Sequence, residues 1–213
     1  MLIYMVVDTG GPLNKLNGLM GISAPEQSVP VMTLIRKHNP KSHDELYKLI
    51  TDHAKHKCSC GIKSKGSVKD FGKKLFEAQK NIWGRYRFSL KQCIQWEYDL
   101  FIIQSMKATS LETKVKRNLN QRLNDSFGVN EVNEFVDDEL RVDLNVTFNG
   151  NLVCGIQVKP ASYQHVRKNV INFNANANKK FGKPVFYVFY EYESEKLINI
   201  DKISPQIKEM VIQ

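Results

Sequence analysis

Hydrophobic and polar residues alternate over Arg141–Phe148, a pattern typical of a half-buried β-strand. The dipeptide Asn149-Gly150 follows, and it is the strongest short-range signal for a tight type I′ turn. The largely apolar run Asn151–Pro160 then returns as a second strand. The two runs predict a β-hairpin whose first strand has four apolar side chains on one face: Val142, Leu144, Val146 and Phe148.

Three polar residues interrupt these apolar runs, Asp143 on the first predicted strand and Gln157 and Lys159 on the second. Gln157 and Lys159 are two positions apart, so their side chains share a face. One interpretation is a solvated face, on which Asp143 and Lys159 form a cross-strand ion pair. The other is a catalytic cluster that needs an acid and a lysine side by side.

The flanking segments predict the rest of a core that begins near Ser110. A helix carries Leu111, Val115, Leu119 and Leu123 at intervals of four and is predicted to end at Gly128. The remaining predicted elements are a short strand at 131–136, a polar helix at 162–181 and strands from 184 and at 196–200. This order predicts an α/β (α+β) core with a mixed sheet flanked by helices.

The N-terminal half has a different pattern. Residues 1–68 are interrupted by polar residues and predict irregular structure, except for a helix over Ser42–His53 with Ser42 as its cap. Helical periodicity resumes from Val68 and again from Ser89. We therefore expect two domains, a mainly helical lobe over 1–108 that contacts DNA or dimerises, and a core over 109–213.

Composition narrows the class of protein. The 213 residues carry a formal net charge of +9, which favours a polyanionic partner such as nucleic acid. No apolar run approaches the length of a membrane span, and the N-terminus lacks the basic segment of a signal peptide. The four cysteines show no disulfide framework, so we expect a reducing cytoplasm.

The order of elements, with Asp143 and the triplet Gln157-Val158-Lys159, resembles the PD-(D/E)XK nuclease superfamily. The resemblance implies that Asp143 binds one or two Mg²⁺ ions and that Gln157 is a second ligand or positions one. It also implies that Val158 contributes its backbone carbonyl, that Lys159 orients or activates the attacking water, and that Glu112 completes the metal shell. Such chemistry suits phosphodiester hydrolysis, which needs a cation to neutralise developing charge.

Two features depart from the family pattern. The triplet begins with Gln157 in place of an acid, which increases the dependence on Asp143 and Glu112. Val142 stands where the family has a proline. Glu112 also has Lys116 four residues later, so an exposed helical ion pair is an alternative interpretation of this acid.

A polar, basic segment follows the triplet, and we expect its side chains to contact phosphates or base edges. The candidates for DNA binding are Tyr163, Gln164, Arg167 and Lys168. His165 is an alternative base. The alternative is that this segment forms an ordinary solvent-exposed helix face with no part in DNA binding.

The segments "VKPASY" and "FGKPVFYVFYEYE" are similar to the MjaI-like subgroup of restriction endonucleases, whose members cut at CTAG. This resemblance implies a type II restriction endonuclease that hydrolyses double-stranded DNA with Mg²⁺ and works as a homodimer. The alternatives are a structure-selective nuclease of the resolvase or repair type, and a non-catalytic DNA-binding protein with a degenerate nuclease fold.

A separate group of residues invites a metal interpretation. His53, His56, Cys58 and Cys60 are the residue types that bind zinc, although their spacing is irregular for a structural site. A basic loop that contacts DNA, or a plain linker, accounts for the same segment.

Overall fold

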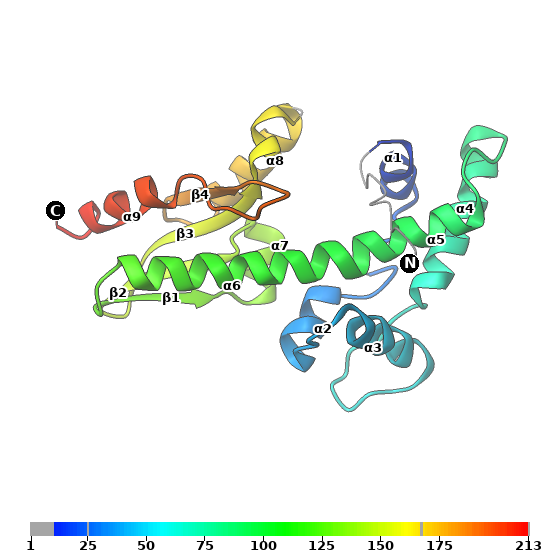
Figure 1. The fold of residues 1–213 in the computed structure, drawn as a ribbon, viewed down its shortest axis with the longest axis horizontal. Coiled ribbons are helices and arrows are strands. Elements are labelled where there is room, and N and C mark those ends of the chain that lie inside the picture. The colour runs from blue at the N-terminus through cyan, green and yellow to red at the C-terminus, as the bar shows by residue number, and fades with distance from the viewer. Residues whose placement is uncertain (1–10, 25, 167, 213) are drawn as a thin grey trace. The chain divides into compact units, whose positions relative to one another are not determined.

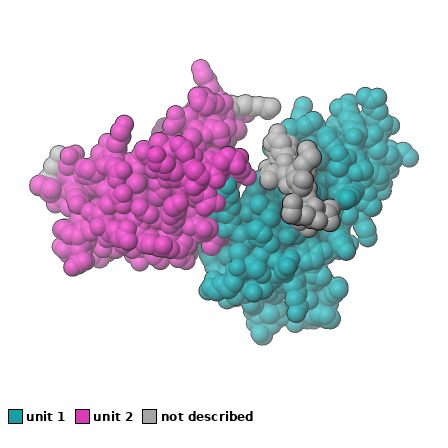
Figure 2. Space-filling view, in the orientation of Figure 1, with its two compact units in different colours: residues 1–108 teal, residues 109–213 magenta. Residues whose placement is uncertain are grey.

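The computed structural model describes residues 11–24, 26–166 and 168–212. The chain divides into two compact units, residues 1–108 and 109–213, which Figure 2 shows in teal and magenta. Within the described residues, no helix is both long and apolar enough to cross a membrane. Each unit has its own buried apolar cluster.

The first unit is built from helices (Figure 1). Its described elements are α1 (Gly11–Met20), α2 (Val31–His38), α3 (His43–Lys55), α4 (Val68–Trp83), α5 (Leu90–Tyr98), the π-helical segment η1 (Asp99–Gln104) and the start of α6 (Ser105–Arg122). Trp96 and Phe71 are its largest fully buried side chains. The sequence prediction of irregular structure was wrong for α1 and α2, whose buried Leu16, Leu34 and Ile35 belong to this core.

Serine side chains begin three helices of this unit. Ser42 Oγ accepts a hydrogen bond from the backbone N–H of Glu45 at 3.2 Å, which confirms the predicted cap of α3. Ser67 and Ser89 cap α4 and α5, each in a reciprocal capping box. The predicted helices therefore begin where the sequence placed them.

The second unit contains a four-stranded sheet in the order β1-β2-β3-β4. The first three strands are antiparallel, and β4 is parallel to β3. The elements after α6 are β1 (Phe127–Glu131), α7 (Glu134–Leu140), β2 (Leu144–Phe148), β3 (Asn151–Pro160), η2 (a 3₁₀ helix, Ala161–His165), α8 (Lys168–Lys179), β4 (Val185–Tyr190) and α9 (Ile200–Glu209). This mixed sheet flanked by helices confirms the predicted fold class.

The predicted hairpin is present. Asn149 and Gly150 have φ angles of 49° and 81°, the left-handed values that a type I′ turn requires. The β2–β3 register shifts between Val146 and Thr147, where β3 has one extra residue.

Several predicted boundaries were wrong. α6 ends at Arg122, and Gly128 lies within β1, opposite Thr147. Residues 134–140 form a helix, because Asn133 caps it by accepting a hydrogen bond from Val136 N–H at 3.0 Å. In the segment 196–200 the strand is reduced to a single bridge between Tyr190 and Leu197.

The two faces of the sheet differ. One face packs against α6 and α9, and its buried side chains include Leu144, Val146, Cys154, Ile156 and Val188. Gln157 and Lys159 alternate with Ile156 and Val158 along β3, so they lie on the opposite face.

The backbone is tightly packed at Gly155 on this second face. A Cβ there would lie 2.8 Å from a methyl of Val142 and 3.0 Å from the ring of Phe181. Val142 therefore packs on the face of Gly155. The predicted alternation of Arg141–Phe148 was wrong at this residue, because the chain bends at Arg141, which has a φ of 56°.

Candidate active site

Asp143 lies immediately before β2, not within it as the sequence predicted. Its backbone N–H donates to the carbonyl of Ile156 at 2.9 Å. Its carboxylate Oδ2 accepts a hydrogen bond from the backbone N–H of Val158 at 2.6 Å. The side chain thus supplies an acceptor to β3 at the point where β2 begins, and this hydrogen bond orients the carboxylate toward the Gln157-Val158-Lys159 triplet.

Gln157 is fully buried, with 0% of its surface exposed. Its amide Oε1 and Nε2 have no hydrogen-bond partner among the described residues. An unsatisfied buried polar group costs about 1–3 kcal/mol, so stability alone does not account for an amide at this place. A ligand that donates a hydrogen bond to Oε1, or accepts one from Nε2, would remove that cost. A cation bound to Oε1 would do the same.

Lys159 is half-buried, and its Nζ lies 5.9 Å from the ring centroid of Tyr163. The Tyr163 ring stacks on that of Tyr187 at 5.8 Å. Tyr187 pairs across the strands with Gln157. These contacts place Lys159 and the two tyrosines in one cluster on the Gln157 face of the sheet.

Asn178 connects α8 to the turn that precedes Asp143. Its Nδ2 donates to the carbonyls of Leu140 and Arg141 at 2.8 and 3.0 Å. Its Oδ1 accepts from the hydroxyl of Tyr187 at 2.6 Å. This buried amide has all of these partners within the unit, and it fixes the backbone two residues before Asp143.

The pKa of Tyr187 is raised to about 12, mainly by burial, with smaller contributions from the nearby Tyr163 and the negative charge of Asp143. Tyr187 therefore keeps its proton at neutral pH and can donate it to Asn178.

Sequence reasoning missed Asn174 and Asn178. They are four residues apart on α8, so they share a helix face, and Asn174 Nδ2 donates to the hydroxyl of Tyr163 at 2.8 Å. The available sequence signal was the four-residue spacing of two asparagines in a polar helix; that both are buried is seen only in the structure. Tyr187 gave no comparable signal in the sequence, because it lies within the aromatic and apolar run of Val185–Tyr190.

Glu112 is half-buried on α6, between the buried Leu111 and Val115. α6 packs on the sheet face opposite Gln157 through Val115 and Leu119. Lys116 forms an ion pair with Glu131 of β1 at 3.2 Å. The role of Glu112 as a metal ligand stays a prediction.

The predicted DNA-binding residues differ in exposure. Gln164 and Lys168 are exposed, as is His165, whereas Tyr163 is half-buried and held by Asn174. Arg167 lies outside the described residues.

The residues around Asp143 fit a hard divalent cation. The Asp143 carboxylate, the Gln157 amide oxygen and the Val158 carbonyl are oxygen donors, which Mg²⁺ prefers, and Mg²⁺ needs few protein ligands because it keeps several waters. The unpartnered amide of Gln157 supports this fit. A lysine of the same strand completes a set of groups suited to hydrolysis of a phosphodiester.

Residues 12–208 match the family model of the MjaI restriction endonuclease, which covers nearly all of the described chain and both of its units. No curated protein and no solved structure matches the chain.

Proposed function

Because the chain belongs to the MjaI restriction endonuclease family, we propose that it is a Mg²⁺-dependent type II enzyme that cuts double-stranded DNA at a specific sequence. The observation that carries the proposal is the Asp143 carboxylate, held at 2.6 Å by the N–H of Val158 within the Gln157-Val158-Lys159 triplet. The enzyme would act in the cytoplasm, where incoming DNA is found.

Each residue has a proposed role. Asp143 holds the cation, the amide oxygen of Gln157 and the carbonyl of Val158 add ligands, and Glu112 completes the shell. A bound Mg²⁺ would neutralise the charge that develops on the phosphate and lower the pKa of a coordinated water. Because Gln157 stands where the triplet would have an acid, the carboxylates of Asp143, immediately before β2, and of Glu112 would supply the ligand charge.

Lys159 orients the attacking water. The half-buried ammonium stabilises the negative charge that accumulates as the water oxygen bonds to phosphorus and a P–O bond of the DNA backbone breaks. The Lys159 Nζ lies 5.9 Å from the ring of Tyr163, and this cation–π contact would help to position the lysine. Tyr163 thereby acts on the reaction through Lys159, in addition to any contact with DNA.

DNA binding is proposed for the segment after β3. Gln164 and Lys168 are exposed there, and Arg167 belongs to the same segment. Together with the net charge of +9 they would give affinity for phosphates that falls as salt rises. Base recognition needs polar side chains that reach the grooves, and Gln164 suits that role.

A homodimer is proposed, because a two-fold protein can cut both strands of a palindromic site. α7 and α8 contact each other and each exposes a phenylalanine, Phe135 at 64% and Phe173 at 61%. If the two rings form one apolar patch across these neighbouring helices, that patch is a candidate for the dimer interface. Light scattering of the purified protein tests the dimer, and Phe173→Lys should shift it toward monomer.

The experiment that tests the proposed activity uses unmethylated phage DNA with Mg²⁺ or with EDTA. Discrete Mg²⁺-dependent fragments are expected, and their ends should lie at CTAG. A short duplex with a single CTAG should be cut, and the same duplex with that CTAG changed by one base pair should stay intact. A smear would indicate a non-specific nuclease. Cutting of branched DNA alone would indicate a structure-selective nuclease, and binding without cutting a degenerate fold.

A further inference from the structure

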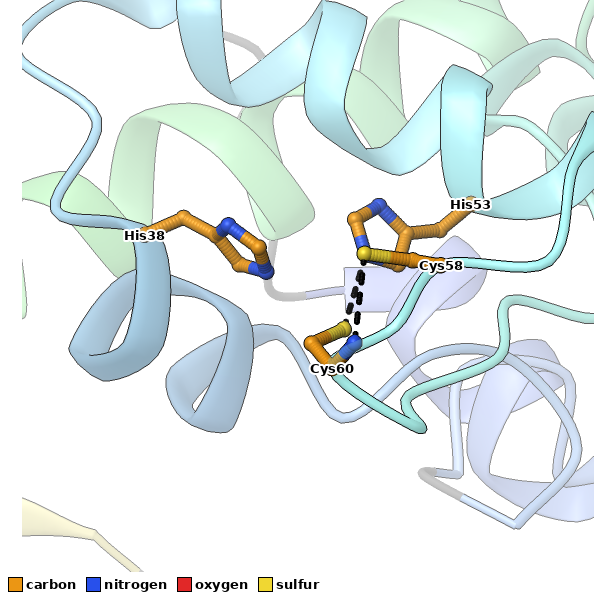
Figure 3. A group of neighbouring side chains, drawn as sticks. All are labelled: His38, His53, Cys58 and Cys60. Atoms are coloured by element: carbon orange, nitrogen blue, oxygen red, sulfur yellow. Dashed lines mark hydrogen bonds between the residues drawn. The ribbon is translucent and has the colours of Figure 1, made fainter.

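Four metal-binding side chains meet in the first unit, whereas the residues of the candidate active site belong to the second. His38, His53, Cys58 and Cys60 each offer a ligand atom, and these atoms all lie within 4.8 Å of one another. Figure 3 shows the two imidazoles and the two thiols directed toward a common centre. They come from the end of α2, the last turn of α3 and the loop that follows α3.

His53 is held in the tautomer that leaves its Nε2 free to bind a metal at the centre of the cluster. Its Nδ1 lies 2.8 Å from the carbonyl of Leu49, and a carbonyl can only accept, so Nδ1 carries the proton. Its Nε2 then presents a lone pair, and it lies 3.2 Å from Cys60 Sγ. Donation of the outer N–H to a backbone carbonyl is the usual support of a metal-bound histidine.

The two cysteines lie in a tight turn. The backbone N–H of Gly61 donates to the carbonyl of Cys58 at 3.1 Å, and Gly61 has a φ of 80°. The N–H of Cys60 donates to Cys58 Sγ at 3.4 Å, so the turn brings both sulfurs to one side. Lys37 Nζ donates to the carbonyl of Cys60 at 2.6 Å and fixes the turn beside the end of α2.

The histidine set differs from the one that the sequence suggested. His56 is exposed and does not belong to the cluster, although its spacing from the cysteines is closer. His38 takes its place, with its ring 5.1 Å from that of His53. Tertiary packing of α2 beside α3 supplies the fourth ligand, which sequence spacing could not show.

We propose that His38, His53, Cys58 and Cys60 bind one structural zinc ion. Two thiolates and two imidazoles are the ligands of closed tetrahedral zinc sites. Zn–S and Zn–N bonds of about 2.3 and 2.0 Å separate the ligand atoms of such a site by about 3.3–3.8 Å. Small side-chain movements bring the observed cluster to that size. Four protein ligands leave no open position, so the ion is structural.

The proposed zinc ion would hold the loop after α3 in place. Residues 56–67 form a loop without helix or strand, and its described backbone bonds to the rest of the unit are few. The ion would join this loop to both α2 and α3. Because metal binding favours only the folded state, it stabilises the first unit.

The test uses the full chain, purified without a chelating tag, and its metal content measured by mass spectrometry. One zinc per chain is expected in the wild type. His38→Gln should lower zinc affinity by more than the roughly 10–100-fold that loss of an outer-shell partner costs. His56→Gln is the matched control and should keep the metal. Cobalt(II) should give a tetrahedral spectrum with thiolate charge-transfer bands in the wild type and the control, and a titration of His38→Gln should need a higher cobalt concentration to reach such bands.

His38 is exposed, so its substitution removes little packing and the variant should fold. EDTA should lower the melting temperature of the wild type and of His56→Gln, and change that of His38→Gln much less. A wild type that binds no zinc and no tetrahedral cobalt overturns the proposal, and so does equal metal loss in both variants. None of these readouts uses DNA cleavage, so they are independent of the proposed function.

Discussion

The carboxylate of Asp143 accepts a hydrogen bond from the backbone N–H of Val158 at 2.6 Å. Asp143 thus lies against the middle residue of the Gln157-Val158-Lys159 triplet, although fourteen residues separate the two in sequence. The hairpin turn and the β2–β3 register produce this pairing. This hydrogen bond joins the two parts of the proposed metal site, Asp143 and the triplet on β3.

Gln157→Glu should create a buried carboxylate that needs a cation. In EDTA the variant should melt at a lower temperature than the wild type, because an unpaired buried charge is costly. Mg²⁺ should restore the melting temperature, and the variant should keep DNA cleavage. Thermal melts with and without Mg²⁺ measure this. The outcome that counts against a ligand position at Gln157 is a folded variant that Mg²⁺ fails to stabilise.

Lys159→Ala should lower the rate of DNA cleavage by at least about 100-fold, because the role proposed for the ammonium is to stabilise developing negative charge. DNA affinity, measured by gel shift, should change no more than in Lys183→Ala. Lys183 is exposed before β4 and serves as the control for loss of one positive charge. Near wild-type cleavage by Lys159→Ala would show that this lysine has no part in the reaction.

Asn178→Ala should loosen the turn that precedes Asp143. It removes hydrogen bonds to Leu140 and Arg141 and leaves the Tyr187 hydroxyl without its acceptor, so we expect a loss of about 2–3 kcal/mol in the free energy of unfolding. If Asn178 positions Asp143, half-maximal cleavage should also need more Mg²⁺. Asn176→Ala, exposed on the same helix, is the control for both measurements. An unchanged Mg²⁺ requirement would leave Asn178 a purely structural role.

The stability of the first unit should depend on pH through Glu97. This side chain is fully buried, and burial raises its pKa from 4.5 to about 7, opposed by a hydrogen bond from Ser23. The folded state therefore holds a proton that the unfolded state has released above pH 4.5, and the stabilisation is lost as pH rises through 7.

Glu97→Gln should remove that pH dependence. At pH 8 the variant should be more stable than the wild type by on the order of 3 kcal/mol, at about 1.4 kcal/mol per pKa unit, and the difference should vanish near pH 4. Urea denaturation across this range measures it. A constant difference between the two proteins at all pH values would contradict a titrating Glu97.

The sequence predicted the parts of the fold that local chemistry determines. The Asn149-Gly150 turn, the serine caps and the four-residue spacing of Leu111, Val115 and Leu119 each act within a few residues. Such signals gave the hairpin, several helix starts and the order of the core elements. They also placed Gln157 and Lys159 on one face.

The errors arose where distant contacts decide the structure. The bend at Arg141 turns Val142 to the Gly155 face, where Val142 and Phe181 both approach the glycine, a contact that the local sequence pattern does not show. Asn178 and Tyr187 support Asp143 from a different helix and strand. His38 joins His53 through the packing of two helices whose boundaries the sequence had given only in part.

The most direct test of the account is cleavage of CTAG-containing DNA by Asp143→Asn. The amide keeps an oxygen for Val158 N–H and removes only the charge, so the variant should fold and bind DNA like the wild type. Its Mg²⁺-dependent cleavage should fall by at least about 100-fold, while Asp125→Asn, an exposed control in the turn before β1, should cut normally. Cleavage by Asp143→Asn at the wild-type rate would contradict the proposed metal site.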